Sequence, residues 1–377
     1  MKYREFGKTG IEVSALGFGC MRLPLIEGSE SEVDVAKSIR LIRHGIDKGI
    51  NYIDTAYPYH GGKSEGITGQ ALLDGYRERV YLATKLPSWL VKSREDMDAF
   101  LDVQLERLGT DYIDFYLIHT LNAAYWPDLI EHGLFDFIAR AKASGKIRHI
   151  GFSFHDDLPI FKEIVDGYDW EFCQIQYNFM DTAYQAGLEG LEYAASRGLG
   201  IVVMEPLRGG SFLRNIPDDI DALWKSSADV SSPADTALRF VWDHGSVGTV
   251  LSGMSSMEQL EQNLESAGRA DAGTLSSDEK KIVARVRDTY VSRIIAACTN
   301  CKYCMPCPSG VDIPVNLTYL NNTSVYNSVE QFKVSYTQFF AESKKASACT
   351  SCGLCEEACP QHISIIDCLK RLDGIMS

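Results

Sequence analysis

The sequence predicts an α/β protein with two parts: a closed (β/α)8 barrel at residues 1–290 and a small, mainly helical, cysteine-rich domain at residues 291–377. Two observations predict this division. Short apolar segments alternate with amphipathic segments along the first part, and nine of the eleven cysteines lie in the second. A chain of 377 residues is long enough for one large barrel and an appended domain.

Eight short segments rich in β-branched, aromatic and aliphatic residues indicate strands. Most of their starting points are 25 to 36 residues apart, the length of one strand–helix unit, and the last interval of 48 residues leaves room for an insertion. The predicted strands begin near Ala15, Asn51, Val80, Asp114, Ile147, Phe172, Gly200 and Gly248.

The segments between these strands have the periodicity of amphipathic helices. Residues 33–48 place Val35, Ile39 and Ile42 at three- and four-residue intervals. Alternating strands and helices require parallel pairing, and eight such units favour a closed barrel. An open doubly wound sheet is the alternative, but no strand is followed by a G-x-G-x-x-G turn. The other predicted helices cover residues 95–108, 129–143, 184–197, 234–244 and 257–267.

Composition and charge limit the partners. The formal net charge is −14, so the surface repels phosphate backbones and anionic lipids, and we expect neither nucleic acid nor membranes as partners. No apolar stretch reaches the length of a membrane span. The charged N-terminal segment lacks the apolar region of a secretion signal, which predicts a cytoplasmic protein.

Reactive side chains follow three neighbouring predicted strands. The second strand leads into Asp54 and Tyr59, the third ends at Lys85 and the fourth at His119. Reduction of a carbonyl needs a proton donor, and a nearby lysine would lower the pKa of a tyrosine from its usual value of about 10. Asp54 would hold Lys85 in place, and His119 would orient the substrate oxygen. Alternatively, the tyrosine and the histidine only contribute to packing, and Asp54 and Lys85 only neutralise each other's buried charge.

Seven segments carry a family resemblance: LGFGCM (16–21), NYIDTAYPYHGGKSE (51–65), ATK (83–85), DFYLIH (114–119), GKIRHIGFSFH (145–155), QIQYN (174–178) and EPLRGG (205–210). Through them the chain resembles the aldo-keto reductases over about residues 1–290. The resemblance implies a catalytic tetrad of Asp54, Tyr59, Lys85 and His119. It also implies a nicotinamide dinucleotide, NADP(H) or NAD(H), bound in an extended form across the barrel mouth.

The resemblance further implies which residues contact this dinucleotide. Ser153 and Gln174 would hold the carboxamide, and Met204 stands where an aromatic ring often stacks on the nicotinamide. Gly253 and Gln259 replace basic residues that often bind a 2′-phosphate, and no Lys or Arg lies between residues 244 and 268. The preference between NADH and NADPH therefore stays open, with Arg208 or Arg269 as other candidate cations. The full predicted set is Gly19, Met21, Asp54, Ser153, Gln174, Met204, Glu205, Leu207, Gly253, Gln259, Gln262 and Asn263.

Two cysteine motifs predict metal clusters in the second part. Residues 298–307 read CTNCKYCMPC, and residues 349–359 read CTSCGLCEEAC followed by Pro360. The second motif is the C-x2-C-x2-C-x3-C-P pattern of bacterial ferredoxins, so we expect two [4Fe–4S] clusters. Two zinc sites are the alternative. The predicted ligands are Cys298, Cys301, Cys304 and Cys359 for one cluster, and Cys307, Cys349, Cys352 and Cys355 for the other.

The whole chain resembles aldo-keto reductases that carry a ferredoxin-like C-terminal extension. The predicted function is an NAD(P)H-dependent oxidoreductase that transfers a hydride between nicotinamide and a small carbonyl or alcohol substrate, with Tyr59 as the proton donor. The clusters either transfer electrons to a partner protein or stabilise the folded structure of the C-terminal segment. Each cluster takes one electron and a hydride carries two, so coupling them needs an intermediary such as a flavin. The alternative function is a non-catalytic nicotinamide redox sensor that regulates a partner protein.

Overall fold

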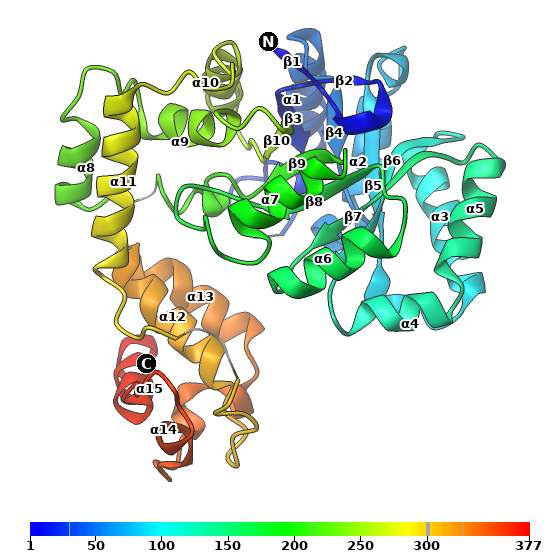
Figure 1. Ribbon diagram of the computed structural model, residues 1–377. Coiled ribbons are helices and arrows are strands. Elements are labelled where there is room, and N and C mark those ends of the chain that lie inside the picture. The colour runs from blue at the N-terminus through cyan, green and yellow to red at the C-terminus, as the bar shows by residue number, and fades with distance from the viewer. Residues whose placement is uncertain (30, 214, 299–301, 327) are drawn as a thin grey trace. The chain divides into compact units, whose positions relative to one another are not determined.

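The computed structural model describes every residue of the chain except 30, 214, 299–301 and 327 (Figure 1). It contains two compact units. The first joins Met1–Gly209 to Ala234–Ser276, and the second joins Gly210–Pro233 to Ser277–Ser377. These units are defined by compactness, and the chain passes between them more than once. The predicted sequence boundary between residues 290 and 291 stays a prediction.

The first unit contains the predicted closed barrel. Its strands are all parallel and follow the order β10-β3-β4-β5-β6-β7-β8-β9 around the barrel, which confirms the (β/α)8 prediction. Each strand begins within two residues of its predicted start. The strands are β3 (Leu16–Gly19), β4 (Tyr52–Asp54), β5 (Tyr81–Leu86), β6 (Ile113–Leu121), β7 (Ile147–Phe154), β8 (Phe172–Gln176), β9 (Gly200–Met204) and β10 (Val247–Ser252).

An N-terminal ribbon, which the sequence analysis missed, precedes the barrel. Strands β1 (Tyr3–Glu5) and β2 (Glu12–Ser14) pair antiparallel, and Phe6 follows β1. The ring of Phe6 packs on Phe115 at 5.0 Å and on the first residue of β8, Phe172, at 5.8 Å between centroids. Because β8 starts at that contact, Phe6 fills the amino-terminal end of the barrel.

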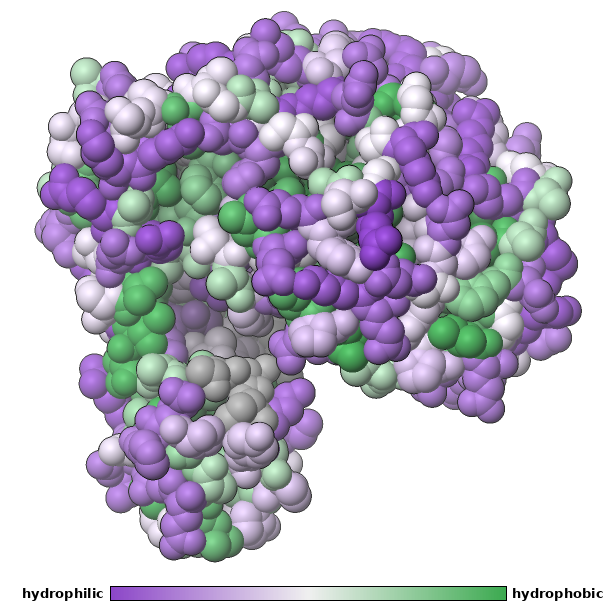
Figure 2. Space-filling view, in the orientation of Figure 1, coloured by the Kyte–Doolittle hydropathy of each residue, from purple (hydrophilic) through white to green (hydrophobic). Residues whose placement is uncertain are grey.

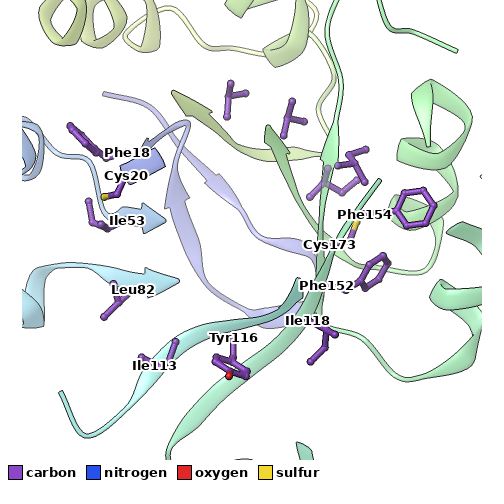
Figure 3. Packing of buried hydrophobic residues seen from close by; sticks show 14 of the residues in the cluster. Phe18, Cys20, Ile53, Leu82, Ile113, Tyr116, Ile118, Phe152, Phe154 and Cys173 are labelled. Carbon is purple, nitrogen blue, oxygen red and sulfur yellow. The ribbon is translucent and has the colours of Figure 1, made fainter. Parts of the chain in front are cut away.

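Buried apolar side chains also join the outer face of the strands to the helices (Figure 3). Phe152 and Phe154 on β7 both pack against Phe161, at 5.8 and 5.0 Å between ring centroids. Cys20 and Cys173 are fully buried in this core, as small apolar side chains often are. The core therefore holds the strands rigidly and leaves their carboxyl ends free to carry polar groups.

The helices of the first unit cover the barrel (Figure 1). The predicted helix over 129–143 is a pair of helices, because Gly133 adopts a left-handed conformation (φ 81°) between them. Helices α2 and α6 were not predicted from the sequence. The glycines of α2 weaken its apolar periodicity and serve close packing, since a Cβ at Gly69 would lie 2.6 Å from the carbonyl oxygen of Leu108. The helices are α1 (Val35–Asp47), α2 (Ser64–Ala71), α3 (Arg94–Leu108), α4 (Tyr125–Glu131), α5 (Leu134–Ala143), α6 (Leu158–Gly167), α7 (Gly187–Ser196), α9 (Pro233–Trp242) and α10 (Met257–Ala267).

The second unit is helical, as predicted for the cysteine-rich part. Helix α12 packs against α15 and α13 around a small apolar core that includes Leu317, Leu320 and Leu369. All the cysteine side chains described for this unit pack against the same core, except that of Cys352, which is exposed. Its helices are α8 (Asp218–Trp224), α11 (Ser277–Val291), α12 (Ile313–Val325), α13 (Val329–Phe339), α14 (Leu354–Glu357) and α15 (Ile365–Met376).

Hydrophilic residues dominate the face of the molecule shown in Figure 2, and apolar residues form smaller patches on it. Within the part of the chain that the structure describes, none of the helices is both long enough and apolar enough to cross a membrane. The predictions about nucleic acid and the cytoplasm stay predictions.

Candidate active site

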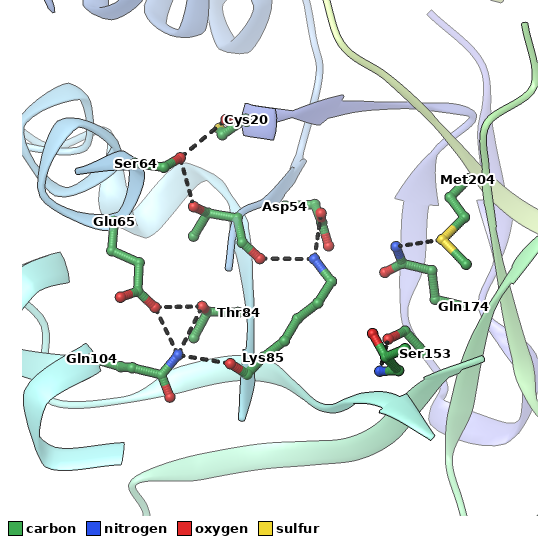
Figure 4. Close-up of polar contacts among 12 residues, drawn as sticks. Cys20, Asp54, Ser64, Glu65, Thr84, Lys85, Gln104, Ser153, Gln174 and Met204 are labelled. Carbon is green, nitrogen blue, oxygen red and sulfur yellow. Dashed lines mark hydrogen bonds and ion pairs between the residues drawn. The ribbon is translucent and has the colours of Figure 1, made fainter. Parts of the chain in front are cut away.

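The structure brings the predicted catalytic residues together at the carboxyl ends of neighbouring strands, and Figure 4 shows two of them, Asp54 and Lys85. Asp54 is the last residue of β4, and Lys85 lies near the end of β5. Both are buried, and Lys85 Nζ lies 2.6 Å from Asp54 Oδ1 and donates to the Thr55 carbonyl oxygen at 2.8 Å. These two acceptors fix the lysine ammonium in one position. The pair has no net charge, but it holds the positive Lys85 ammonium rigidly at the ends of these strands.

Tyr59 and His119 lie beside this ion pair. Tyr59 begins a short 3-10 helix, Tyr59–Gly62, just after β4, and Lys85 Nζ lies 5.0 Å from the centre of its ring. His119, on β6, lies with its ring 6.1 Å from that of Tyr59, and the indole of Trp89 packs on His119 at 5.2 Å. The four residues thus form one group, in which Lys85 contacts Tyr59 and Tyr59 contacts His119.

Burial changes the ionisation of this group. Burial raises the pKa of Tyr59, and the Lys85 ammonium only partly opposes that rise. The lysine charge alone would lower the pKa of Tyr59, as expected from the sequence, but burial outweighs it. For Lys85, burial disfavours the ammonium, but Asp54 and Tyr59 together hold its pKa above the ordinary value. The phenol is therefore protonated, and the lysine charged, at neutral pH.

His119 is neutral in this environment. Burial, together with the charge of Lys85 and the nearby His155, holds the pKa of His119 well below its ordinary value of 6.5. Its Nδ1 atom is buried and has no hydrogen-bond partner among the residues that the structure describes. A neutral imidazole carries one N–H donor and one acceptor, so it can bind a polar substrate group without carrying a charge itself.

A second polar network, which the sequence analysis missed, holds the backbone of Lys85. Glu65 on α2 is fully buried and accepts hydrogen bonds from Thr84 Oγ1 and Gln104 Nε2, both at 2.7 Å. The Gln104 amide also donates to the Lys85 carbonyl oxygen at 3.0 Å (Figure 4). Arg107 pairs with Glu65 at 3.1 Å. Nothing in the sequence distinguishes Glu65 from a surface glutamate, because its role depends on contacts between separate elements.

The residues predicted to hold a carboxamide lie next to each other on β7 and β8. Ser153 is opposite Gln174 in the strand register, and both are buried. Ser153 Oγ accepts from the Thr120 N–H at 2.7 Å, and the Gln174 amide contacts Met204 Sδ at 3.4 Å. Gln174 Oε1 is buried and has no partner among the described residues. This open acceptor beside a hydroxyl fits the amide group of a nicotinamide.

The remaining predicted cofactor contacts lie at or after the ends of β3, β9 and β10. Asn263 donates to Ser252 Oγ at 3.0 Å, and Gln259 Oε1 accepts from the Ser255 N–H at 2.9 Å. Glu205 has a left-handed backbone (φ 54°) and begins a tight loop after β9. The other members of the predicted set are Gly19, which approaches the start of the loop after β10, and Met21, Leu207, Gly253 and Gln262.

The two other candidate cations are already paired. Arg208 lies 3.5 Å from the carboxylate of Asp181, and Arg269 lies 2.9 Å from that of Asp235. Asp181 and Asp235 are both buried, so each arginine neutralises a buried carboxylate, and Asp235 is also paired with Arg239 at 3.8 Å. Neither arginine is therefore a convincing source of charge for a cofactor phosphate.

The second unit contains two cysteine-lined cavities. A cavity of about 160 Å³ is lined by Cys307 and by the first three cysteines of the second motif, Cys349, Cys352 and Cys355. Cys298 and Cys359 line the other cavity, and Cys304 borders both. The described cysteines of each predicted ligand set thus line the same cavity. Cysteine thiolates are the ligands that hold iron–sulfur clusters. The remaining predicted ligand, Cys301, lies outside the described residues.

Taken together, a parallel barrel with a buried Asp–Lys pair beside a tyrosine and a cysteine-lined helical unit define an oxidoreductase with iron–sulfur clusters. The chain belongs to the aldo/keto reductase family, whose family model matches residues 15–286. A 4Fe-4S dicluster domain model matches residues 297–364. This second match confirms the prediction of [4Fe–4S] clusters over the zinc alternative.

Several known proteins are similar to the barrel part of the chain. L-galactose dehydrogenase of Arabidopsis thaliana is 29% identical over 308 residues, which cover 74% of this chain and 93% of that protein. The uncharacterized oxidoreductase YqkF of Bacillus subtilis is 27% identical and covers 74% of this chain and 95% of its own length. The structure of aldo-keto reductase AKR11C1 from Bacillus halodurans, in its holo form, aligns with a TM-score of 0.63 at 28% identity, over 76% of this chain and 96% of that one.

Proposed function

We propose that the protein is an NAD(P)H-dependent oxidoreductase that interconverts a small carbonyl compound and its alcohol, with Tyr59 as the proton donor. The observation that carries the proposal is the buried Lys85, which is fixed between Asp54 and Thr55 and lies against the Tyr59 ring. The bound nicotinamide supplies or accepts the hydride. The name of the similar L-galactose dehydrogenase agrees with an alcohol or carbonyl substrate.

The proton comes from the Tyr59 phenol. Because burial keeps the pKa of Tyr59 above its ordinary value, the phenol enters the reaction protonated. As negative charge develops on the carbonyl oxygen, the phenol donates its proton, and the adjacent Lys85 ammonium stabilises the phenolate that is left. Asp54 keeps that ammonium charged and in place. In the reverse direction the phenolate removes the proton from the alcohol.

Three other residues orient the reactants. His119, which is neutral, offers an N–H to the substrate oxygen without competing as an acid. Ser153 and Gln174 lie across the barrel mouth, and the open Gln174 Oε1 would accept from the carboxamide of the nicotinamide. A fixed carboxamide sets the orientation of the nicotinamide ring relative to Tyr59, which is the geometric requirement for hydride transfer.

The proposal predicts the pH dependence of carbonyl reduction. The protonated phenol is the active form, and its raised pKa means that activity falls only above about pH 10. The pKa of His119 is lowered, so it does not change charge near its ordinary value of about 6.5. We therefore expect the rate constant of the chemical step, measured by rapid mixing, to stay flat between about pH 6.5 and 10. A decline centred near pH 7 that Tyr59→Phe abolishes would contradict the assignment.

We further propose that the clusters stabilise the second unit. Its apolar core is small, and six of the predicted ligand cysteines pack against that core, so bound clusters would add most of the cross-links in this unit. The number of electrons transferred supports this structural role. The barrel site is arranged for transfer of a hydride, which carries two electrons, whereas each cluster accepts one electron at a time. Electron exchange with a partner protein is the competing role.

Cys352→Ser tests the cluster assignment. We expect the iron content of anaerobically purified protein to fall from about eight to about four atoms per chain, and residues beyond about 290 to become sensitive to protease. The matched control is Cys368→Ser, because Cys368 contacts the same core but belongs to neither predicted ligand set. Full iron content in Cys352→Ser, or equal losses in both variants, would show that the ligand assignment is wrong.

A further inference from the structure

The backbone around His119 departs from the regular pairing of the barrel strands. Between two paired positions, β6 runs from Ile118 to Leu121, whereas β7 advances by only two residues. Strand β6 therefore has one extra residue here, in a β-bulge formed by His119 and Thr120. A β-bulge changes the direction of a side chain relative to the regular alternation of the strand. This one lies at the histidine that is proposed to orient the substrate.

The second residue of the bulge, Thr120, is strained. Its backbone is left-handed, with φ 55°. This conformation is rare for residues other than glycine, and it is especially unfavourable for a β-branched residue such as threonine. It persists only where surrounding contacts maintain it. Neighbouring groups must therefore hold the bulge in place.

The peptide group between His119 and Thr120 is held at both ends by serine hydroxyls. Ser88 Oγ donates to the His119 carbonyl oxygen at 2.6 Å, and the Thr120 N–H donates to Ser153 Oγ at 2.7 Å. Both serines are buried. Ser153 lies on β7, and Ser88 begins the 3-10 helix Ser88–Leu90 that follows β5. The two hydroxyls therefore fix the plane of this peptide group from both neighbouring strands.

The end of β5 explains why a side chain is needed on that side. The paired residues of β5 end at Leu86, opposite Ile118, so the backbone pairing stops one residue before His119. Ser88 then supplies the donor for the His119 carbonyl oxygen. The next residue, Trp89, packs on the imidazole at 5.2 Å between ring centroids. One short helix thus holds both the backbone and the ring of His119.

We propose that Ser88 is a positioning residue for His119, an inference that rests on the proposed function. The Ser88 hydroxyl fixes the bulged peptide group and so directs the imidazole toward the substrate oxygen. A hydrogen bond from an imidazole N–H is directional, so a small rotation of the backbone of His119 would misalign it. Ser88 takes no part in the proton or hydride transfer, because its own proton is donated to the His119 carbonyl oxygen.

A double-mutant cycle of Ser88→Ala and His119→Ala tests this inference on the full chain with its clusters. The substrate is the aliphatic or aromatic aldehyde that the unsubstituted protein reduces fastest. We expect Ser88→Ala to lower kcat about 10- to 100-fold with little change in KM, and to leave the dissociation constant of NADH within about twofold. In the His119→Ala background, Ser88→Ala should cause no further loss of kcat, because the side chain that it positions is absent.

Two further variants separate positioning from stability. Ser88→Thr keeps a hydroxyl at this position and should restore most of the turnover. Ser14→Ala removes another buried serine hydroxyl, which donates to the carbonyl oxygen of Leu16 at 2.7 Å. Because Leu16 begins β3, this hydrogen bond lies at the amino-terminal end of the barrel. Ser14→Ala should therefore lower the urea midpoint of the barrel and leave kcat unchanged.

The outcomes separate this inference from the proposed function. Unchanged kcat in Ser88→Ala, or a full further loss in the His119→Ala background, would overturn the role of Ser88 while the proposed function stands. Equal losses of kcat in Ser88→Ala and Ser14→Ala would identify lost stability as the cause and would also overturn that role. If the unsubstituted protein reduced no aldehyde with NADH or NADPH, the proposed function would be overturned, and this inference with it.

Discussion

Replacing Tyr59 by Phe is expected to lower turnover about 10²- to 10⁴-fold, the range that a positioned proton donor contributes. The substitution removes one oxygen and leaves the ring against Lys85 and His119. Because the phenol does not hold the dinucleotide, we expect the dissociation constants of NADH and NADPH to stay within about twofold of the unsubstituted protein. Steady-state kinetics and fluorescence quenching measure the two effects separately.

Tyr57→Phe is the matched control for this substitution. Tyr57 lies two residues earlier, but its ring packs on Phe100 at 5.2 Å and under Arg107 at 4.3 Å. Its hydroxyl belongs to no part of the proposed site, so turnover should not change. Turnover that survives Tyr59→Phe, or that falls equally in both variants, would contradict the role of Tyr59 as proton donor.

Replacing Lys85 by Met should destabilise the barrel as well as abolish turnover. The substitution leaves the Asp54 carboxylate buried with no counter-ion and removes the hydrogen bond to the Thr55 carbonyl. Breaking a buried ion pair in this way costs about 3–5 kcal/mol of the free energy of unfolding. The loss is measured as a lower urea midpoint of the barrel transition, followed by tryptophan fluorescence.

A double variant separates the two effects. Asp54→Asn combined with Lys85→Met removes both charges, so most of the lost stability should return, because a neutral pair has no unpaired buried charge. Turnover should stay low, since no ammonium remains to stabilise the phenolate of Tyr59. Equal stability of the single and double variants would show that the Asp54–Lys85 pair is not the cause.

The barrel could be predicted from the sequence because its signals are local and repeated. Each strand is a short apolar run such as that of β6, and the helical periodicity between strands requires parallel pairing. Where local signals are weak, the prediction failed. Helix α2 packs through small residues rather than an apolar stripe, and a single glycine, Gly133, divides one predicted helix into two.

The sequence was sufficient to predict which residues form the candidate site, but it was not sufficient to predict their ionisation. The sequence placed Asp54 and Lys85 on adjacent strand ends, and the structure pairs them. It could not show that burial outweighs the lysine charge and raises the pKa of Tyr59, because burial depends on packing from several elements. Glu65 was not predicted for the same reason, because its hydrogen-bond partners come from distant parts of the chain.

The most direct test of the proposed function is an anaerobic single turnover with nicotinamide cofactor that carries deuterium at C4. NADH and NADPH, each labelled on either face, are mixed with a panel of aliphatic and aromatic aldehydes, while the absorption of the clusters is followed. We predict an alcohol with one deuterium on the carbon that bears the hydroxyl, and unchanged cluster absorption. An unlabelled alcohol, or bleaching of the clusters as the cofactor is oxidised, would contradict direct hydride transfer in this barrel.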